Sequence, residues 1–550
     1  MNCMRLTFYT TLLTRIYGDD LAAHVEPRLQ NLAERYRGKI PKPADVSLSE
    51  RDSILILYGD QVRKAGKPHL QTLTEFCQSW LIGKVSGIHI LPFFPWSSDD
   101  GFSVKDYRAV DPSLGNWRDI EQLGQSFRLM FDGVINHASA QGEWFQAFLR
   151  NEEPYRDYFL TVDGDPDLSM VVRPRALPLI TEFQTVSGPR RVWTTFSADQ
   201  VDLDYHNPDV LLEILDILLM YAQHGAQFIR LDAIAYLWKE IGTPCIHLPQ
   251  THAVIQLLRA VFNEVAPHVH LITETNVPHK ENISYFGDGT NEAQLVYNFA
   301  LPPLVLHTIR TGDASVISEW AADLKLPSDQ TTFFNFLASH DGIGLNPAQG
   351  IISPAEIDRL VEQTLTHGGL ISFKQKSDGT QSPYELNINY FDALSDPSSS
   401  EPLELQVDRF MAAQAIMLSL RGVPGIYFHS LFGSRNWNEG VNLTNHNRTI
   451  NRQKLERAYL ESELADPKSL RAQVFGRCCQ LLVQRSACTA FHPHGGQEIL
   501  DMGRNVFAVL RRSPNGDKHV LCLQNVTAQT QAAAAHTLAP YQTLWLENQK

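Results

Sequence analysis

The chain lacks the features that mark several large classes of protein. Its seven cysteines are odd in number and include no CxxC pair, so the sequence indicates neither a disulfide framework nor a zinc site. The formal net charge of −14 comes without any basic stripe, which argues against a nucleic-acid partner. No apolar run approaches the roughly 18 residues of a membrane span, and threonines and charges interrupt the weakly signal-like residues 1–20. We therefore expect a cytoplasmic protein with neither a nucleic-acid nor a membrane partner.

What the chain does contain is a regular alternation of apolar strands and helices. Eight strand-like runs can be counted: Ser53–Tyr58, Gly87–Pro92, Arg128–Ile135, Phe228–Ala233, His270–Glu274, Leu295–Phe299, Phe334–Asp341 and Val423–Phe428. Helical patterns separate most of them, as over Gln71–Ile82 and Leu211–His224. Continuous apolar strands separated by helices are typical of a parallel sheet covered on both faces. The pattern predicts an α/β fold that closes as a (β/α)8 TIM barrel.

Four stretches do not fit this alternation. Two of them, residues 138–206 and 342–405, are too long for ordinary loops and predict inserted subdomains. Near the C-terminus, Asn505–Leu510 and His519–Leu523 have the pattern of paired strands. The chain is expected to divide as follows: 1–52, an N-terminal helical extension; 53–137, the first barrel segment; 138–206, inserted subdomain B; 207–341, the second barrel segment; 342–405, a second insertion; 406–484, the third barrel segment; 485–550, a small C-terminal β domain.

Charged residues stand at the carboxyl ends of three predicted strands. Arg230 and Asp232 alternate along one strand, so their side chains point to the same face. Glu274 ends a second strand, and His340 and Asp341 end a third. Each residue alone has a structural explanation, as a buried ion pair or a helix cap. In a barrel, however, the carboxyl ends of all strands meet at one mouth. The sequence therefore predicts an active site built from three carboxylates.

Three carboxylates around one pocket suit the cleavage of a glycosidic bond. Retention of configuration requires a nucleophilic carboxylate and an acid/base carboxyl about 5 to 5.5 Å apart. A third negative group stabilises an oxocarbenium-like transition state. Arg230 should lower the pKa of Asp232, whereas Glu274 needs a raised pKa in order to donate a proton. His137 and His340 are suitable hydrogen-bond donors to sugar hydroxyls.

Four blocks in this order resemble the α-amylase superfamily of retaining glycosidases and transglycosylases. The blocks are Asp132–His137, Arg230–Ile234, Ile272–Thr275 and Ala338–Asp341. The resemblance implies that Asp232 is the nucleophile, Glu274 the acid/base and Asp341 the transition-state stabiliser. It also implies three glucose contacts at the donor subsite, namely Arg230, His137 and His340.

Further blocks are similar to the sucrose-phosphorylase subfamily. They are Leu91–Trp96, Asp99–Phe102, Arg173–Arg175, Phe299–Leu304 and Asn447–Arg452. This likeness implies that Asp99 and Arg448 clamp the far hydroxyls of glucose, and that Phe102 and Arg175 also contact substrate. Inorganic phosphate, rather than water, would take the glucosyl group from Asp232 and leave as α-glucose 1-phosphate. The resemblance implies no metal and no organic cofactor, and we expect a monomer or homodimer.

The acceptor is predicted from departures within this likeness. Glu274–Asn282 and Gly342–Gly350 differ from sucrose phosphorylases and, with the N-terminal extension, resemble the branch that phosphorolyses glucosylglycerol and glucosylglycerate. The first insertion carries arginines that could attract a glycerate carboxylate or be solvated loop charges: Arg173, Arg175, Arg190 and Arg191. Glu182 lies in the same segment and would repel a carboxylate.

We therefore predict a retaining glucosylglycerol phosphorylase, with glucosylglycerate as the alternative substrate. Further alternatives are a sucrose or sucrose 6′-phosphate phosphorylase, an α-glucosidase and a non-catalytic binding subunit with an amylase fold.

Overall fold

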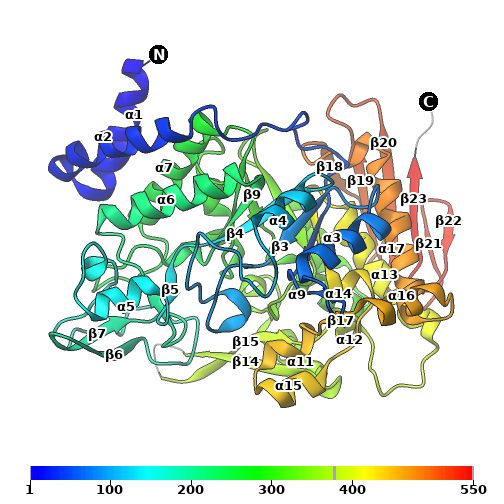
Figure 1. Ribbon diagram of the computed structural model, residues 1–550. Helices are drawn as coiled ribbons and strands as arrows, with labels where there is room; N and C mark the ends of the chain where they lie inside the picture. Colours follow the sequence, from blue (N-terminus) through cyan, green and yellow to red (C-terminus); the bar gives the residue numbers. More distant parts are fainter. Residues whose placement is uncertain (1, 376–378, 548–550) are drawn as a thin grey trace.

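The chain folds around a closed barrel of eight parallel strands. Figure 1 shows it as a computed structural model that describes residues 2–375 and 379–547. Positions 1, 376–378 and 548–550, which fall in three of the segments predicted above, lie outside the described residues. The barrel strands are β1 (Ile54–Leu57), β3 (Gly87–Ile90), β4 (Arg128–Val134), β9 (Ala226–Asp232), β10 (His270–Thr273), β11 (Leu295–Tyr297), β12 (Thr332–Phe336) and β16 (Val423–Tyr427). Neighbours in the barrel follow chain order, which confirms the predicted (β/α)8 fold.

Helices cover the outside of the barrel. The principal ones are α3 (His69–Trp80), α4 (Trp117–Gly124), α6 (Pro208–Gln223), α7 (Pro249–Val265), α9 (Leu301–Thr311), α10 (Ser315–Asp323), α13 (Leu403–Ser419) and α17 (Leu470–Ser486). Local sequence fixes their starts: the Asn116 side chain caps α4, and Asn207 caps α6 ahead of a proline at the first helical position. Among the described residues, no helix combines the length and apolarity that a membrane-spanning segment needs.

The N-terminal segment forms two helices that pack on the outside of the barrel. They are α1 (Asn2–Tyr17) and α2 (Asp19–Tyr36), drawn in blue beside the green α6 and α7 in Figure 1. In α2 the apolar residues Val25, Leu29 and Leu32 are buried. The hydroxyl of Tyr36 also donates to Asp216 Oδ1 of α6 at 2.9 Å. The helical spacing seen in the sequence therefore reflects an amphipathic face buried against the barrel helices.

Two insertions interrupt the barrel and lie at the carboxyl ends of its strands. The first follows β4 and contains β5 (His137–Ser139), α5 (Glu143–Leu149), β6 (Ile180–Thr185), β7 (Gly188–Trp193) and β8 (Gln200–Asp202). The second follows β12 and contains β13 (Ile343–Gly344), α11 (Pro354–Thr366), β14 (Leu370–Gln375) and β15 (Gln381–Asn387). The β14–β15 hairpin of the second insertion was not predicted. Half-exposed β14 and the proline at 383 remove the apolar alternation that identifies a strand.

The predicted strand Phe334–Asp341 is too long. The backbone leaves the ladder after Phe336, which pairs with Gly425 of β16. His340 and Asp341 therefore stand in the loop that follows β12, not on the strand. This loop gives both side chains access to the barrel mouth.

The C-terminal segment forms a four-stranded antiparallel sheet, drawn in red and orange in Figure 1. Its strands are β18 (Gly496–Ile499), β19 (Val506–Arg512), β20 (His519–Asn525) and β23 (Thr543–Glu547), with a small hairpin of β21 (Gln531–Ala533) and β22 (His536–Leu538). The two strands predicted here correspond to β19 and β20, which pair with each other as expected.

Two buried arginines join this sheet to the barrel. Arg485 is 1% exposed and donates to five backbone carbonyls, among them those of Asp52 before β1 and Gly422 before β16. Arg511 on β19 is fully buried and donates to three more carbonyls. Burial lowers the pKa of Arg485 to about 10 and that of Arg511 to about 9. The two guanidinium groups tie together segments far apart in the sequence.

We expect Arg485→Met to lower the free energy of unfolding by about 3 kcal/mol, because buried carbonyls lose their donors. Arg477→Met on the same helix is the matched control: its side chain is 42% exposed and pairs with Asp408, so it should cost less than about 1 kcal/mol. Chemical and thermal unfolding of both variants measure the difference. Equal stability of the two variants would contradict the role given to Arg485.

Candidate active site

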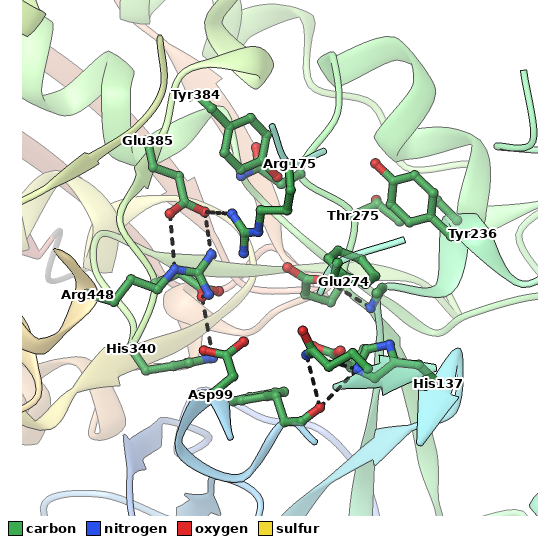
Figure 2. Close-up of a pocket in the computed structure, with 18 of the residues that line it drawn as sticks. Asp99, His137, Arg175, Tyr236, Glu274, Thr275, His340, Tyr384, Glu385 and Arg448 are labelled. Carbon is green, nitrogen blue, oxygen red and sulfur yellow. Dashed lines mark hydrogen bonds and ion pairs between the residues drawn. The ribbon is translucent and has the colours of Figure 1, made fainter. Parts of the chain in front are cut away.

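A pocket opens at the carboxyl ends of the barrel strands, between the two insertions. It is lined by Asp99, Phe102, His137, Arg175, Phe196, Gln200, Asp232, Ala233, Ala235, Tyr236, Glu274, Thr275, Asn276, Val277, His340, Asp341, Tyr384, Glu385 and Arg448. Figure 2 shows the labelled Arg175, Glu385 and Arg448 turned toward one another at this pocket. Nine of the ten residues predicted for the site line this pocket, and the exception is Arg230.

Arg230 lies beneath the pocket as a buried cation. Its side chain is 2% exposed, and Nη1 contacts Asp232 Oδ1 at 2.8 Å and Asp132 Oδ1 at 2.5 Å. Asp132, on neighbouring β4, also contacts Nε2 of buried His89 at 2.7 Å. Arg230 is thus placed to hold carboxylates in position rather than to line the pocket wall.

The pKa of Asp232 is raised, not lowered as the sequence predicted. Burial is the largest cause, and the Arg230 guanidinium and His137 only partly offset it. The neighbouring charges of Asp132 and Asp341 also raise it. The prediction was wrong in sign because it considered Arg230 alone, whereas burial outweighs Arg230 and the nearby Asp132 charge, brought close by strand pairing in the barrel, adds to the rise.

Glu274 follows directly after β10 and reaches the same guanidinium. Its Oε1 lies 3.6 Å from Arg230 Nη2, and Oε2 accepts a hydrogen bond from the backbone N–H of Ala233 at 3.1 Å. Ala233 has a left-handed φ of 51°, which is uncommon for alanine. Burial raises the pKa of Glu274 to about 8, with the charges of Asp232 and Asp341 adding to the effect. This is the direction that a proton donor requires.

Asp341 is paired with an arginine from a distant segment. Nη1 of Arg448 lies 2.6 Å from Asp341 Oδ1. Burial favours the protonated form of Asp341, but Arg448, with Arg230, outweighs it and holds the pKa below its usual range. The Asn451 side chain donates to the backbone carbonyl of Asp341 at 3.0 Å and so fixes the loop. Asp341 is therefore held as an anion.

Asp99 and Arg448 both line the pocket, but each has a different partner. Asp99 lies 3.7 Å from Nη1 of Arg452, which also contacts Asp100 at 2.6 Å. Arg448 instead forms a two-bond contact with Glu385, at 2.6 and 3.1 Å. Sequence reasoning missed Arg452 as the arginine beside Asp99, although its motif was recognised.

The two histidines of the pocket differ in their protein contacts. The ring of His340 stacks on Phe102 with centroids 4.6 Å apart, and burial lowers the His340 pKa well below its usual value. His137 Nε2 lies 2.9 Å from the Phe102 carbonyl oxygen and 3.2 Å from Gln200 Nε2. His340 is therefore a neutral ring on the pocket wall, whereas His137 is held by protein contacts.

Arg175 is the arginine of the first insertion that lines the pocket. Its Nη1 lies 3.8 Å from Glu385 Oε1, and its guanidinium lies 5.7 Å from the ring centroid of Tyr384. The other three arginines that the sequence offered are directed elsewhere: Arg173 to the Leu177 carbonyl, Arg191 to the Gly164 carbonyl, and Arg190 to an exposed face of β7. Glu182 lies exposed on β6 and does not line the pocket.

Glu385 and Tyr384 were missed because they belong to the unpredicted β15. Glu385 is 1% exposed and holds both Arg448 and Arg175, as Figure 2 shows. No strand pattern in the sequence pointed to this segment. A buried carboxylate inside a half-polar hairpin could be found only from the folded chain.

Several known proteins with similar sequences are named phosphorylases. The family model described as the α-amylase catalytic domain matches residues 82–342. A protein of Spirochaeta thermophila named glucosylglycerate phosphorylase is 53% identical over 94% of this chain and 88% of its own length. A protein of the same name from Allomeiothermus silvanus is 52% identical over 90% of this chain and 91% of its own. A protein of Marinobacter adhaerens named glucosylglycerol phosphorylase is 27% identical over 80% of this chain and 88% of its own.

A solved structure has the same fold. The crystal structure of sucrose 6F-phosphate phosphorylase from Thermoanaerobacter thermosaccharolyticum aligns with a TM-score of 0.76 and 24% identity, covering 92% of this chain and 100% of that chain. The barrel and the relatives agree with the motifs found in the sequence. The chain belongs to the α-amylase superfamily, in its branch of retaining glucoside phosphorylases.

Proposed function

We propose that this enzyme phosphorolyses glucosylglycerate to α-glucose 1-phosphate and glycerate. The observation that carries the choice of glycerate is the identity of about half with two relatives of that name, against 27% with a glucosylglycerol phosphorylase. The sequence-based preference for glycerol rested on Glu182. This residue lies outside the pocket, so it does not repel a glycerate carboxylate bound there. The proposal includes a cytoplasmic enzyme, monomeric or dimeric, that uses no metal or organic cofactor.

In the proposed mechanism, Asp232 attacks the anomeric carbon of the glucosyl group. Glu274, protonated because of its raised pKa, gives its proton to the departing glycerate oxygen. Phosphate then attacks the glucosyl–Asp232 ester while Glu274 takes a proton from the phosphate. The two displacements together retain the configuration of the anomeric carbon. Asp341, kept ionised by Arg448, stabilises positive charge on the sugar ring in both steps. The contact of Asp232 and Glu274 with the one Arg230 guanidinium supports this pairing.

The donor subsite in this proposal is the floor of the pocket. Asp99 and His340 both line the pocket, and their buried Oδ1 and Nδ1 atoms have no hydrogen-bond partner among the described residues. Buried polar atoms of this kind are costly unless a ligand or water satisfies them. Sugar hydroxyls can both donate and accept, so a glucosyl group would satisfy both.

The acceptor side has to receive two different anions in turn. Phosphate and glycerate both carry negative charge, and two arginines line the pocket, Arg175 and Arg448. Arg448 pairs with Asp341 and also forms a two-bond contact with Glu385, so it offsets these two carboxylates only in part. Arg175 lies 3.8 Å from Glu385 and is the less engaged of the two cations. Together with protonation of Glu274, which removes a further negative charge from the wall, Arg175 supports an anionic acceptor.

The reaction is tested most directly in reverse. α-Glucose 1-phosphate is supplied with glycerate, glycerol, fructose or fructose 6-phosphate, and phosphate release is followed. We expect glycerate to give by far the highest kcat/KM. A higher kcat/KM with glycerol would instead identify a glucosylglycerol phosphorylase. Release of glucose without any need for an acceptor or phosphate would identify a hydrolase.

We expect Arg175→Ala to impair use of glycerate about 10- to 100-fold, the value of one charge-assisted hydrogen bond. α-Glucosyl fluoride is the donor of choice for this test, because it forms the glucosyl-enzyme without placing phosphate against Arg175. With glycerol as acceptor, the same variant should change kcat/KM less than about three-fold. Glycerol has no carboxylate, so no charge-assisted hydrogen bond to the acceptor is lost. Arg190→Ala, on exposed β7, is the matched control and should affect neither acceptor.

A further inference from the structure

The loop that carries Asp99 has an unfavourable backbone. Three consecutive residues have positive φ: Asp99 at 52°, Asp100 at 48° and Gly101 at 110°. A Cβ atom at position 101 would lie 2.6 Å from the Pro92 carbonyl oxygen, so only glycine fits there. Aspartate tolerates the left-handed region better than most residues, but a run of such residues does not hold itself. Contacts from outside the loop must fix this conformation.

One anchor comes from the barrel side. Arg452, which is 2% exposed, contacts Asp100 at 2.6 Å and Asp99 at 3.7 Å, and its Nε donates to the His340 carbonyl at 2.8 Å. This arginine therefore ties the loop to the segment of the third carboxylate. It holds the acidic tip of the loop, whereas the serines at the two ends of the loop are held by another residue.

That second anchor is Asp199, from the first insertion. One oxygen, Oδ2, accepts hydrogen bonds from the hydroxyls of Ser97 at 2.5 Å, Ser103 at 3.0 Å and Ser98. The Ser103 hydroxyl is also 2.8 Å from the Asp199 backbone carbonyl. Ser97 and Ser98 precede the strained residues directly, and Ser103 follows them after one intervening residue. A single carboxylate therefore closes the base of the loop.

We propose that Asp199 is a positioning residue that holds Asp99 against the glucosyl group. A carboxylate suits this position because three hydroxyl donors converge on it, and ionised acceptors form stronger hydrogen bonds than neutral ones. The next residue, Gln200, lines the pocket, so the same short segment both supports and forms the donor subsite. In this way the inserted subdomain sets donor affinity through a residue that does not touch the sugar. The inference rests on the proposed function, in which Asp99 contacts glucose.

Asp199→Ala should lower kcat/KM for α-glucose 1-phosphate about 10- to 100-fold, as expected when a substrate contact moves by about 1 Å. Most of the loss should appear in KM for this donor, with KM for glycerate unchanged. Asp199→Asn retains an acceptor oxygen and should give an intermediate value. Asp165→Ala, an almost fully exposed aspartate of the same insertion, is the matched control and should behave as wild type. Equal increases in both KM values would overturn the proposal.

A double-mutant cycle with Asp99→Ala separates this inference from the proposed function. If Asp199 acts through Asp99, then Asp199→Ala should change kcat/KM less than about two-fold in the Asp99→Ala background. If the fold-loss in kcat/KM of the double variant equals the product of the two single fold-losses, the positioning role of Asp199 is overturned, while Asp99 remains in the donor subsite. Wild-type kinetics for Asp99→Ala alone would instead refute the donor subsite itself. If Asp199→Ala does not fold, the Ser97→Ala/Ser98→Ala double variant replaces it. A rise in KM for α-glucose 1-phosphate with unchanged KM for glycerate would support the proposal, and wild-type values of both KM would refute it.

Discussion

Asp232→Asn is expected to lower kcat by about 10⁴-fold or more, because the variant loses the nucleophile on which a covalent mechanism depends. The amide is close in size to the carboxylate and can still accept the hydrogen bond that Arg230 donates to Oδ1. Its oxygen is a poor nucleophile, however, and cannot form the glucosyl ester. Folding should therefore be kept while phosphorolysis is lost. Release of α-glucose 1-phosphate from glucosylglycerate and phosphate measures the effect.

The covalent intermediate gives this prediction a second readout. A Glu274→Gln variant supplied with α-glucosyl fluoride should accumulate glucosyl-enzyme, since the fluoride leaves without a proton but the ester lacks its general base. Mass spectrometry of a digest should find the sugar on the peptide that contains Asp232. Asp165→Asn serves as the control for aspartate replacement. A sugar adduct on another residue, or Asp232→Asn with more than a few per cent of wild-type turnover, would remove Asp232 from the nucleophile role.

Glu274→Gln is the second large effect, with an expected loss of about 10²- to 10⁴-fold in kcat/KM for glucosylglycerate. The glycerate oxygen needs a proton as it leaves, and the amide of this variant cannot give one. The first step with α-glucosyl fluoride should be much less affected. In the wild type, phosphorolysis should fall above about pH 8, because burial raises the Glu274 pKa to about 8. It should also fall in acid, because the raised pKa of Asp232 means that the nucleophile becomes protonated there. The alkaline limb should be absent from the residual activity of the variant.

The same pKa has a consequence for stability, whose sign can be derived. Glu274 titrates near 4.5 when exposed and near 8 in the folded enzyme, so the folded state binds the extra proton between these values. Its contribution to stability is full below pH 4.5 and declines as the pH rises toward 8. The Glu274→Gln variant lacks this dependence. Scanning calorimetry should therefore find the variant more stable than wild type at pH 8.5, with the advantage shrinking toward pH 5.

The barrel and its three carboxylates were predictable from sequence for one physical reason. Parallel strands buried on both faces must be continuously apolar, so the charged residues that end them stand out. Asp232 and Glu274 could be found in this way. Asp341 was also found, although its strand ends at Phe336 and the residue lies in the loop beyond.

Three features of the site depended on the folded chain. The pKa of Asp232 depends on its burial and on the charge of Asp132, a closeness that only strand pairing creates. Glu385 belongs to a hairpin whose half-exposed strands carry no alternation. The first insertion has little periodic structure, so residue pattern and charge did not distinguish Arg175 from its three neighbouring arginines, and only the family resemblance pointed to it.

The walls of the pocket come from two parts of the chain. The residues proposed to break and form the glycosidic bond come from barrel strands or the loops directly after them, whereas Arg175, Tyr384 and Glu385 come from the two insertions. In the proposed mechanism, substitutions in the insertions should therefore change which leaving group is accepted while the bond-making residues stay in place.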